Sequence, residues 1–353
     1  MTEGNGSLFG AAVKRREDRR LITGTGTFLD DINPPNPAYA AILRSPHAHA
    51  TINAVKLNAA RQHPGVLGAF AGADFEAVNP LALAMPVGGV ETNGHTPHVL
   101  AIDKVRYQGE PVAVVVAENQ DIADDAVQLI EVDYGELPAV IDAEAALKES
   151  APVLHESEMG NKVFHWEAGD KSAMDEALVG ADAIVSHRIH NQRLIPNAME
   201  TRGSIAVYNP GEDSYTLWTT TQAPHVQRIL VAAFVLGIPE HRLRVITPQD
   251  LGGGFGSKIF TYYDMPLVLL LAKRIGRPVK FVESRQENYA ATPRPRPRPL
   301  HRRRGQERWN SDRPQGSLRC QPRRILLDHR TGCRRNPLRS DDLGALPFSG
   351  TAQ

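Results

Sequence analysis

The pattern of apolar and polar positions over residues 20–140 predicts a small α+β unit. Strand-like runs occur at residues 38–44, 50–55, 65–70, 111–117, 131–134 and 139–141. The run at 111–117 is apolar almost without a break, which is typical of a strand buried on both faces. Asn119 follows it and is a suitable N-cap for a helix over residues 120–130.

A second segment over residues 171–292 alternates strands and helices after an irregular linker at 141–170. Strand-like runs occur at residues 182–189, 204–208, 214–220, 242–247 and 278–282. Helices are predicted at 224–236 and 262–275, and each ends at a glycine. If the strands at 214–220 and 242–247 are neighbours, the loops after them open at the same end of a sheet, where α/β proteins bind ligands.

The loop after the strand at 242–247 is glycine-rich: Gly252, Gly253, Gly254 and Gly256 surround Phe255. Without Cβ atoms, its backbone can adopt φ > 0 and bring N–H groups close to an anion. Its spacing fits neither a Walker loop nor the dinucleotide fingerprint, which disfavours nucleotide hydrolysis and simple NAD chemistry. The alternative is an ordinary glycine-rich turn with Phe255 inserted in the core.

Polar side chains follow the neighbouring strand. Gln222 comes directly after the run at 214–220 and could face the glycine-rich loop, or it could cap the next helix. Glu200 and Arg202 lie in a polar loop, and the alternative to a functional role is a surface ion pair. His47 and His49 form an H-x-H pair that could contact a metal, but such a pair beside a proline usually belongs to a hydrogen-bonded turn.

Charge divides the chain at residue 292. Residues 1–292 carry a net charge of −10, whereas residues 293–353 carry +10, from 15 arginines, no lysine and five acidic residues. Both cysteines, Cys320 and Cys333, lie in the second part, so the first offers no cysteine ligand. Residues 1–19 form a polar N-terminal arm without a signal-peptide pattern, and a cytoplasmic location is expected.

The arginine-rich segment has two interpretations. It could be a disordered basic tail that binds nucleic acid. Alternatively, abundant arginine with scattered Pro, Ser and Cys is what an out-of-frame translation of a GC-rich gene produces. We favour a frameshift, which predicts that residues 293–353 are disordered.

Several ordered motifs resemble the large subunit of bacterial molybdenum hydroxylases, the family of xanthine dehydrogenase, aldehyde oxidase and carbon monoxide dehydrogenase. REDRRLITG at 16–24 resembles the start of that subunit, and RSPHAHA at 44–50 and YQGEPVA at 107–113 resemble its α/β hammerhead domain. NAME at 197–200, TQAPH at 221–225 and the glycine-rich loop resemble the first part of its molybdopterin-binding domain. The resemblance covers residues 12–291 and ends where the composition changes.

The resemblance implies a molybdenum–molybdopterin cofactor, usually the cytosine dinucleotide form in bacteria. It implies oxidation of a small carbon substrate with water as the oxygen source. It also implies an iron–sulfur small subunit and an FAD-binding medium subunit, assembled as a dimer of heterotrimers. The cofactor-binding residues it suggests are Gln222, Gly253, Gly254, Phe255 and Gly256.

The chain also departs from the family pattern. Ile259 stands where xanthine-oxidising members place a substrate-binding glutamate, which argues against a purine and resembles the carbon monoxide dehydrogenase-like branch. In the family, the general-base glutamate lies in the C-terminal half of the large subunit, beyond the part that matches residues 12–291. No catalytic residue is therefore assigned here. We therefore expect an N-terminal portion that is inactive alone. A non-catalytic hammerhead module that docks partner subunits is a further alternative.

Overall fold

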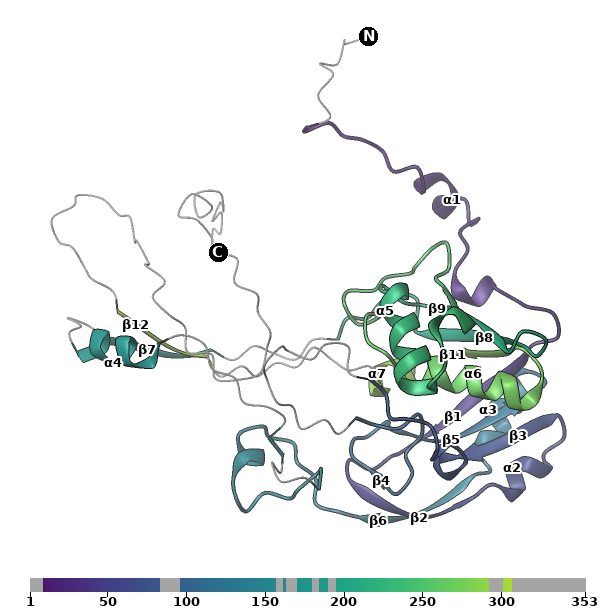
Figure 1. Cartoon of the computed structure of the whole chain (residues 1–353), viewed down its shortest axis with the longest axis horizontal. Coiled ribbons are helices and arrows are strands. Elements are labelled where there is room, and N and C mark those ends of the chain that lie inside the picture. Colours follow the sequence, from purple (N-terminus) through teal and green to yellow (C-terminus); the bar gives the residue numbers. More distant parts are fainter. Residues whose placement is uncertain are drawn as a thin grey trace, which may run out of the picture. The chain divides into compact units, whose positions relative to one another are not determined.

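The computed structural model describes residues 9–82, 96–156, 161–162, 170–179, 184–189, 195–291 and 301–306 (Figure 1). Its strands are β1 Ala38–Arg44, β2 Ala50–Lys56, β3 Val66–Ala71, β4 Lys104–Val105, β5 Pro111–Ala117, β6 Glu131–Glu136, β7 Ile184–Ile189, β8 Gly203–Asn209, β9 Ser214–Thr219, β10 Leu243–Ile246, β11 Val279–Val282 and β12 His301–Gln306. Its α-helices are α1 Asp18–Ile22, α2 Asn58–Gln62, α3 Gln120–Val127, α4 Lys171–Val179, α5 Pro224–Ile229, α6 Asp264–Ile275 and α7 Arg285–Ala291. The chain divides into two units, a larger one over 1–86, 94–156 and 195–294, and a smaller one over the remainder.

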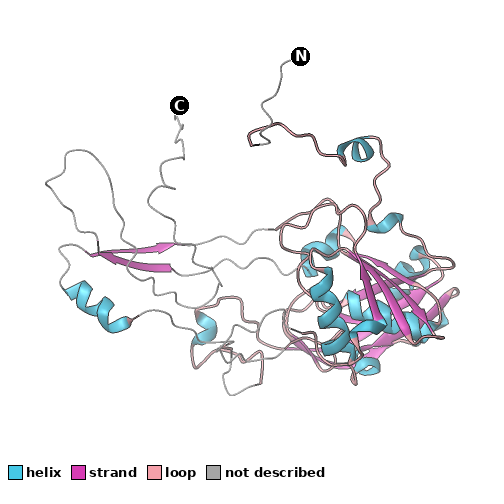
Figure 2. Cartoon of the chain, turned by 45° about the horizontal axis from the view of Figure 1, so that its top comes forward, coloured by secondary structure: helices cyan, strands magenta, loops and turns pink. Residues whose placement is uncertain are grey.

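One seven-stranded sheet organises the larger unit, in the order β10-β9-β8-β11-β1-β5-β3 (Figure 2). A second sheet has the order β4-β2-β6. In the large sheet, β1 pairs in parallel with β11, so that Ala38 lies opposite Val279. Strands from both predicted segments therefore share one sheet, which the local pattern does not indicate. The boundaries predicted at 140 and 171 stay a prediction.

The apolar run of β5 is buried along its whole length, as its sequence predicts. Ala113, Val115 and Ala117 belong to a core cluster with residues of α3. Val114 and Val116 belong to another cluster, which contains residues of α6. Since side chains alternate along a strand, the two clusters lie on opposite faces of β5, and both faces need apolar residues.

The sequence pattern predicts the start of α3 correctly but places its end three residues too late. Asn119 Oδ1 accepts a hydrogen bond from the Ile122 N–H at 2.9 Å, which confirms the predicted N-cap. The helix ends at Val127 instead of 130, because the next three residues close i→i−3 hydrogen bonds in a tighter final turn. The strand predicted at 139–141 is wrong, because β6 ends at Glu136 and no ladder continues beyond it.

The second half of the unit carries a π-helical continuation that the sequence pattern missed. The helix predicted at 224–236 is α-helical only to Ile229 and π-helical from Leu230 to Leu236. It ends at Gly237 as predicted, with φ 64°. The short helix α7 was not predicted at all.

In the smaller unit, β12 pairs antiparallel with β7, and His301 lies opposite Ile189. These six residues belong to the segment predicted to be disordered, and the structure differs from that prediction because their backbone groups pair with β7. The other residues of 293–353, including Cys320 and Cys333, lie outside the described residues. Among the helices that the structure describes, none has the length and apolar character needed to cross a membrane.

Glu110 introduces a pH dependence into the larger unit. It is buried, with 4% of its surface exposed, and burial raises its pKa to about 7 although the Arg106 N–H donates to its Oε2. Since the unfolded value is about 4.3, the folded state binds more protons between these two pKa values, and the free energy of unfolding falls as pH rises through this window.

We expect this fall to amount to about 3 kcal/mol between roughly pH 4 and pH 8. Glu110→Gln should remove it, as measured by urea unfolding at several pH values. The exposed Glu118→Gln serves as the control and should keep the wild-type pH profile. An unchanged profile in Glu110→Gln would contradict the assignment.

Candidate functional site

The glycine-rich loop and Gln222 meet at one end of the large sheet, as the sequence predicts. Strands β9 and β10 are parallel neighbours, so the loops that follow them open on the same side. The Gln222 N–H donates to the Lys258 carbonyl at 2.9 Å, and the Gly256 N–H donates to Gln222 Oε1 at 3.0 Å. A Cβ atom at Gly254 would overlap the Gln222 carboxamide, so this close approach requires glycine.

The loop backbone adopts positive φ at three positions: 102° at Gly253, 49° at Phe255 and 83° at Gly256. Phe255 is a non-glycine residue in this region, which is uncommon and mildly strained. Its side chain is 71% exposed. The alternative in which Phe255 fills the core is therefore wrong.

Three successive amides of the loop are available for a ligand. In the part of the chain that the structure describes, the N–H groups of Gly253, Gly254 and Phe255 donate to no protein acceptor. Successive backbone N–H groups without acceptors can form a site for an anion or a polar group. The loop offers these donors to a ligand, and Gln222 lies beside it.

Beneath the loop lies a buried ion pair that sequence reasoning missed. Lys258 is 1% exposed, and its Nζ lies 3.0 Å from Glu200 Oε2. Burial lowers the pKa of Lys258, whereas the Glu200 carboxylate opposes this change. The signal available in the sequence was a lysine two residues after the glycine-rich loop, with a glutamate in the polar loop at 197–203.

Arg202 is buried, and the alternative of a surface ion pair with Glu200 is wrong. Its Nη2 donates to Glu283, and its guanidinium carbon lies 3.6 Å from the centroid of the Tyr262 ring. Burial opposes the charge of Arg202, but Glu283 and Tyr263 hold its pKa above the usual value. The pKa of Asp264 is raised by burial, which Arg202 opposes. These residues support the chain segments on which Glu200 and α6 lie.

Gln222 does not cap α5, whose N-cap residue is Ala223. Gln227, which the sequence analysis did not identify, connects α5 to the chain after the loop. Its Nε2 donates to the Ile259 carbonyl, and its Oε1 accepts from Thr261 at 2.7 Å. This fully buried glutamine fixes the chain that leaves the loop.

The two histidines of the H-x-H pair lie in a hydrogen-bonded turn. Ser45 Oγ accepts from the His47 N–H at 3.0 Å, and His49 Nδ1 lies 2.8 Å from the Pro138 carbonyl oxygen. Within the described ranges, no three His, Cys, Asp or Glu side chains are grouped to hold a metal ion.

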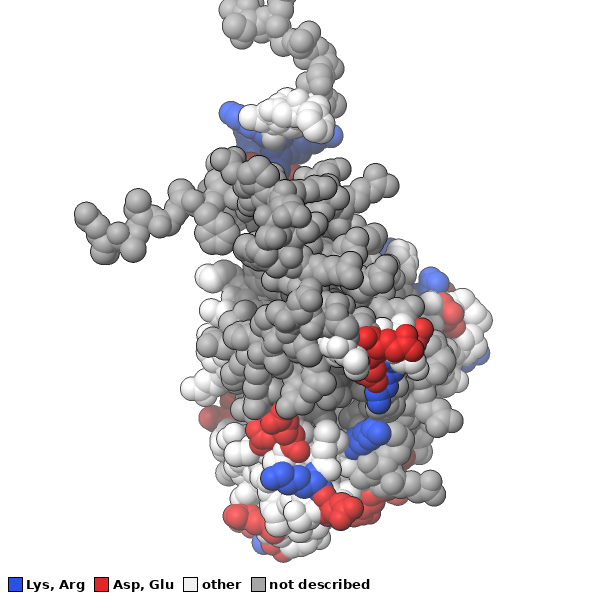
Figure 3. Space-filling model, turned by 90° about the vertical axis from the view of Figure 1, so that its left-hand side faces the viewer, with Lys and Arg blue, Asp and Glu red and all other residues white. Residues whose placement is uncertain are grey.

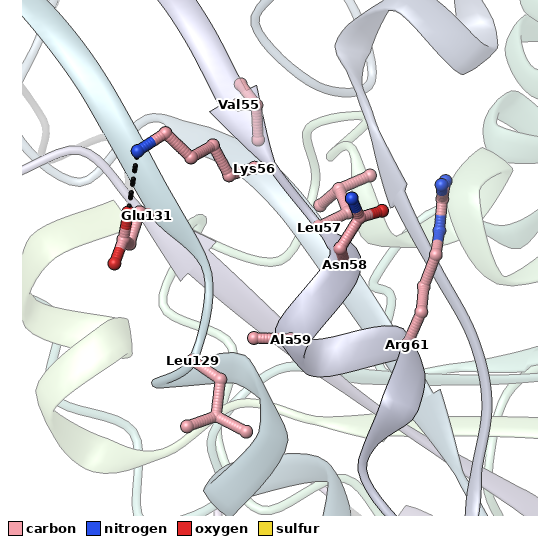
Figure 4. Close-up of a pocket in the computed structure, with 8 residues that line it drawn as sticks. All are labelled: Val55, Lys56, Leu57, Asn58, Ala59, Arg61, Leu129 and Glu131. Carbon is pink, nitrogen blue, oxygen red and sulfur yellow. Dashed lines mark hydrogen bonds and ion pairs between the residues drawn. The ribbon is translucent and has the colours of Figure 1, made fainter.

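A hollow of about 420 Å³ lies at the edge of β2 and α2 (Figure 4). It is lined by Val55, Lys56, Leu57, Asn58, Ala59, Arg61, Leu129 and Glu131. Its lysine and glutamate form an ion pair of 2.9 Å with each other. None of the predicted site residues lines it, so we do not place the functional site there.

Two family models match the chain. The aldehyde oxidase and xanthine dehydrogenase a/b hammerhead domain matches residues 23–138, and the molybdopterin cofactor-binding domain matches residues 154–308. The first covers the predicted α+β unit. The second covers the site described above and extends past residue 292 into the arginine-rich segment.

Curated relatives match over most of the chain. The carbon monoxide dehydrogenase large chain of Hydrogenophaga pseudoflava is 39% identical over 290 residues, which is 78% of this chain and 35% of that protein. The nicotine 6-hydroxylase large subunit of Paenarthrobacter nicotinovorans is 38% identical over 81% of this chain and 34% of its own length. The chain therefore spans about a third of these relatives.

Solved structures agree with this match. Quinoline 2-oxidoreductase from Pseudomonas putida 86 superposes with a TM-score of 0.74 at 37% identity, covering 84% of this chain and 36% of that chain. Carbon monoxide dehydrogenase from Oligotropha carboxidovorans gives a TM-score of 0.74 at 34% identity, covering 83% and 37%. The hammerhead and molybdopterin-binding arrangement predicted from the motifs is thus confirmed.

Proposed function

The chain belongs to the aldehyde oxidase and xanthine dehydrogenase family of molybdenum hydroxylases, and on this premise we propose that its glycine-rich loop and Gln222 contact a molybdenum–molybdopterin cofactor. The observation that carries the proposal is the hydrogen bond from the Gly256 N–H to Gln222 Oε1. It joins the loop and the glutamine into one site. The cofactor form that we expect is the cytosine dinucleotide.

The residues present fit such a group. A pterin with a phosphate-bearing chain offers polar and anionic atoms, and the amides of Gly253, Gly254 and Phe255 are donors without protein acceptors in the described residues. A Cβ at Gly253 would contact Ala198 and the Phe255 ring, so the backbone there is close-packed and fixed. When bound, the cofactor supplies the redox chemistry that adds oxygen from water to a substrate.

Gln222 is the residue of this chain that we expect to interact directly with the reacting centre. Since Gly256 occupies its Oε1, its Nε2 is left as a donor, and this atom has no acceptor in the described residues. A fixed amide donor can orient and stabilise an oxygen atom on which charge develops. The exposed Phe255 side chain offers an apolar surface beside the loop, against which the cofactor can pack.

We further propose a small carbon substrate other than a purine. Ile259 occupies the position at which purine-oxidising members carry a glutamate, and its side chain is partly exposed beside the loop. An aliphatic side chain offers no hydrogen bond to a purine ring. We also propose that the chain assembles with an iron–sulfur subunit and an FAD-binding subunit into a dimer of heterotrimers. A cytoplasmic location is part of the same proposal.

We also propose that residues 293–353 result from a frameshift, and that the chain is inactive by itself. The chain covers about a third of its relatives, and the change of composition at residue 292 supports the proposal. The family match to residue 308 and the pairing of β12 with β7 count against a frameshift for residues 293–308.

The nucleotide sequence past codon 292 tests this directly. We expect another frame to encode an apolar-patterned continuation with a glutamate motif of the family. If no frame does so, the segment is a genuine product and the nucleic-acid hypothesis gains. On the face in Figure 3, the described acidic and basic side chains are interspersed in the lower part, and a group of basic side chains lies near the top.

The restored chain should then be co-expressed with iron–sulfur and FAD subunits in a host that makes the cofactor. We expect stoichiometric molybdenum and pterin in the restored complex, and much less in the 353-residue chain. A folded, partner-bound complex without molybdenum would overturn the enzyme assignment and favour the docking module.

Gln222→Met in the restored complex is expected to lower kcat about 100-fold, since one preorganised donor is lost. Molybdenum content should change little, because the loop amides remain. The exposed Arg228→Met on α5, the helix that follows Gln222, is the control and should keep wild-type turnover. Equal kcat in Gln222→Met and wild type would remove Gln222 from the reaction.

A further inference from the structure

Glu200 joins the two ends of the glycine-rich loop. Its Oε2 accepts from the Gly252 N–H at 2.9 Å and from Lys258 Nζ at 3.0 Å. Its own N–H donates to the Gly252 carbonyl at 3.0 Å. One carboxylate oxygen therefore holds Gly252, where the loop begins, and Lys258, two residues beyond Gly256; these two residues are called the loop ends below.

The second oxygen of Glu200 anchors the carboxylate to another part of the fold. Its Oε1 accepts from the Leu29 N–H at 3.2 Å, in a turn that follows the N-terminal segment. The same N-terminal segment reaches the start of the loop through Asp250, which accepts from the Thr27 N–H at 2.9 Å and from Arg20. Both oxygens of Glu200 are used, so its carboxylate has a fixed orientation.

The packing around Glu200 requires this arrangement. A Cβ at Gly252 would overlap Glu200 Cβ, which explains why the loop begins with glycine. Lys258 has 1% of its side chain exposed, so its ammonium depends on a carboxylate partner. The positive φ angles at Gly253, Phe255 and Gly256 need surrounding contacts that hold the backbone in place.

We propose that Glu200 is a positioning residue, which sets the conformation of the glycine-rich loop by holding Gly252 and Lys258 together. Its importance for cofactor binding rests on the function proposed above, but its action on the loop does not. Glu200 fixes the loop ends, the loop ends fix Gly256, and Gly256 orients the Gln222 carboxamide. The residue thereby acts on the site without touching the cofactor.

Residue-resolved amide hydrogen exchange on the full 353-residue chain tests the proposal. The reporters are the amides of Gln222, Gly256 and Ser257, because each is hydrogen-bonded within the site but none to Glu200. In Glu200→Gln we expect their exchange to accelerate at least about tenfold, as for the loss of a charge-assisted hydrogen bond. Amides of β8 and α6 should remain near wild type.

Glu240→Gln is the matched control, since it removes the charge of an exposed glutamate paired with Arg228. It should leave all amides at wild-type rates. Unchanged reporters in Glu200→Gln would overturn the proposal. An equal acceleration in β8 and α6 would also overturn it, because Glu200 would then only stabilise the fold.

A second variant covers the case in which Glu200→Gln fails to fold. Glu200→Gln with Lys258→Met removes the uncompensated ammonium and should restore folding, whereas the loop ends remain untied and the reporters still exchange faster. Wild-type exchange in this double variant would contradict the proposal. Since no measurement here requires a cofactor, a restored, partner-bound complex without molybdenum would refute the proposed function and leave this test intact.

Discussion

Arg202→Met is expected to destabilise the larger unit by about 3–5 kcal/mol, the largest effect among the substitutions considered. The guanidinium is 3% exposed and is the cationic partner of Glu283 and Asp264. Its removal takes the guanidinium away from Asp264 and leaves Glu283 with the more distant Arg44 guanidinium at 4.0 Å. It also removes the stacking on Tyr262. Urea unfolding followed by circular dichroism measures the change.

Two comparisons make this prediction specific. Arg242→Met breaks an exposed pair with Asp213, and we expect it to cost no more than about 1 kcal/mol. Arg202→Lys keeps the charge but loses the planar stacking on Tyr262 and the hydrogen bond from Nη2 to Glu283, so we expect an intermediate loss. A cost below about 1 kcal/mol for Arg202→Met would show that the carboxyl groups find other partners or become neutral.

Gly254→Ala should have the second large effect, and this effect is on function. The backbone at Gly254 has no positive φ, so the substitution introduces no backbone strain. The new methyl group would overlap the Gln222 side chain and displace it from the Gly256 N–H. We expect overpacking to cost about 1–3 kcal/mol, and the displaced amide to lower kcat about 100-fold in the restored complex.

Gly211→Ala is the control for this substitution. The nearest heavy atom to its added Cβ is Asn209 Oδ1 at 3.5 Å, an ordinary contact. We expect unchanged turnover and stability there. If Gly254→Ala also retained wild-type turnover and Gln222 exchange, the close approach of Gln222 and the loop would have no functional role.

The meeting of Gln222 with the glycine-rich loop could be predicted because it depends on local order. Two strands joined by one helix usually lie parallel and adjacent, so their following loops share one end of the sheet. The apolar run of β5 and the Asn119 cap were predictable for the same reason: the information lies within a few residues.

The buried charges could not be predicted in this way. Glu200 and Arg202 stand two residues apart in a polar loop, a pattern that normally indicates a surface pair. Their partners, Lys258 and Glu283, are far away in the sequence, and only the fold brings them together. The outward position of Phe255 was similarly hidden, because its positive φ depends on the glycines and contacts around it.

The parallel pairing of β1 with β11 has a consequence for synthesis of the protein on the ribosome. Ala38 finds its partner Val279 only when the chain has grown by about 240 residues. At about 5–20 residues per second, one edge of β1 waits roughly 12–50 seconds for its neighbour. An unpaired strand edge invites association with other chains. Pairing of β1 with β5 covers only the opposite edge of β1, so the edge that faces β11 stays open to other chains until β11 emerges.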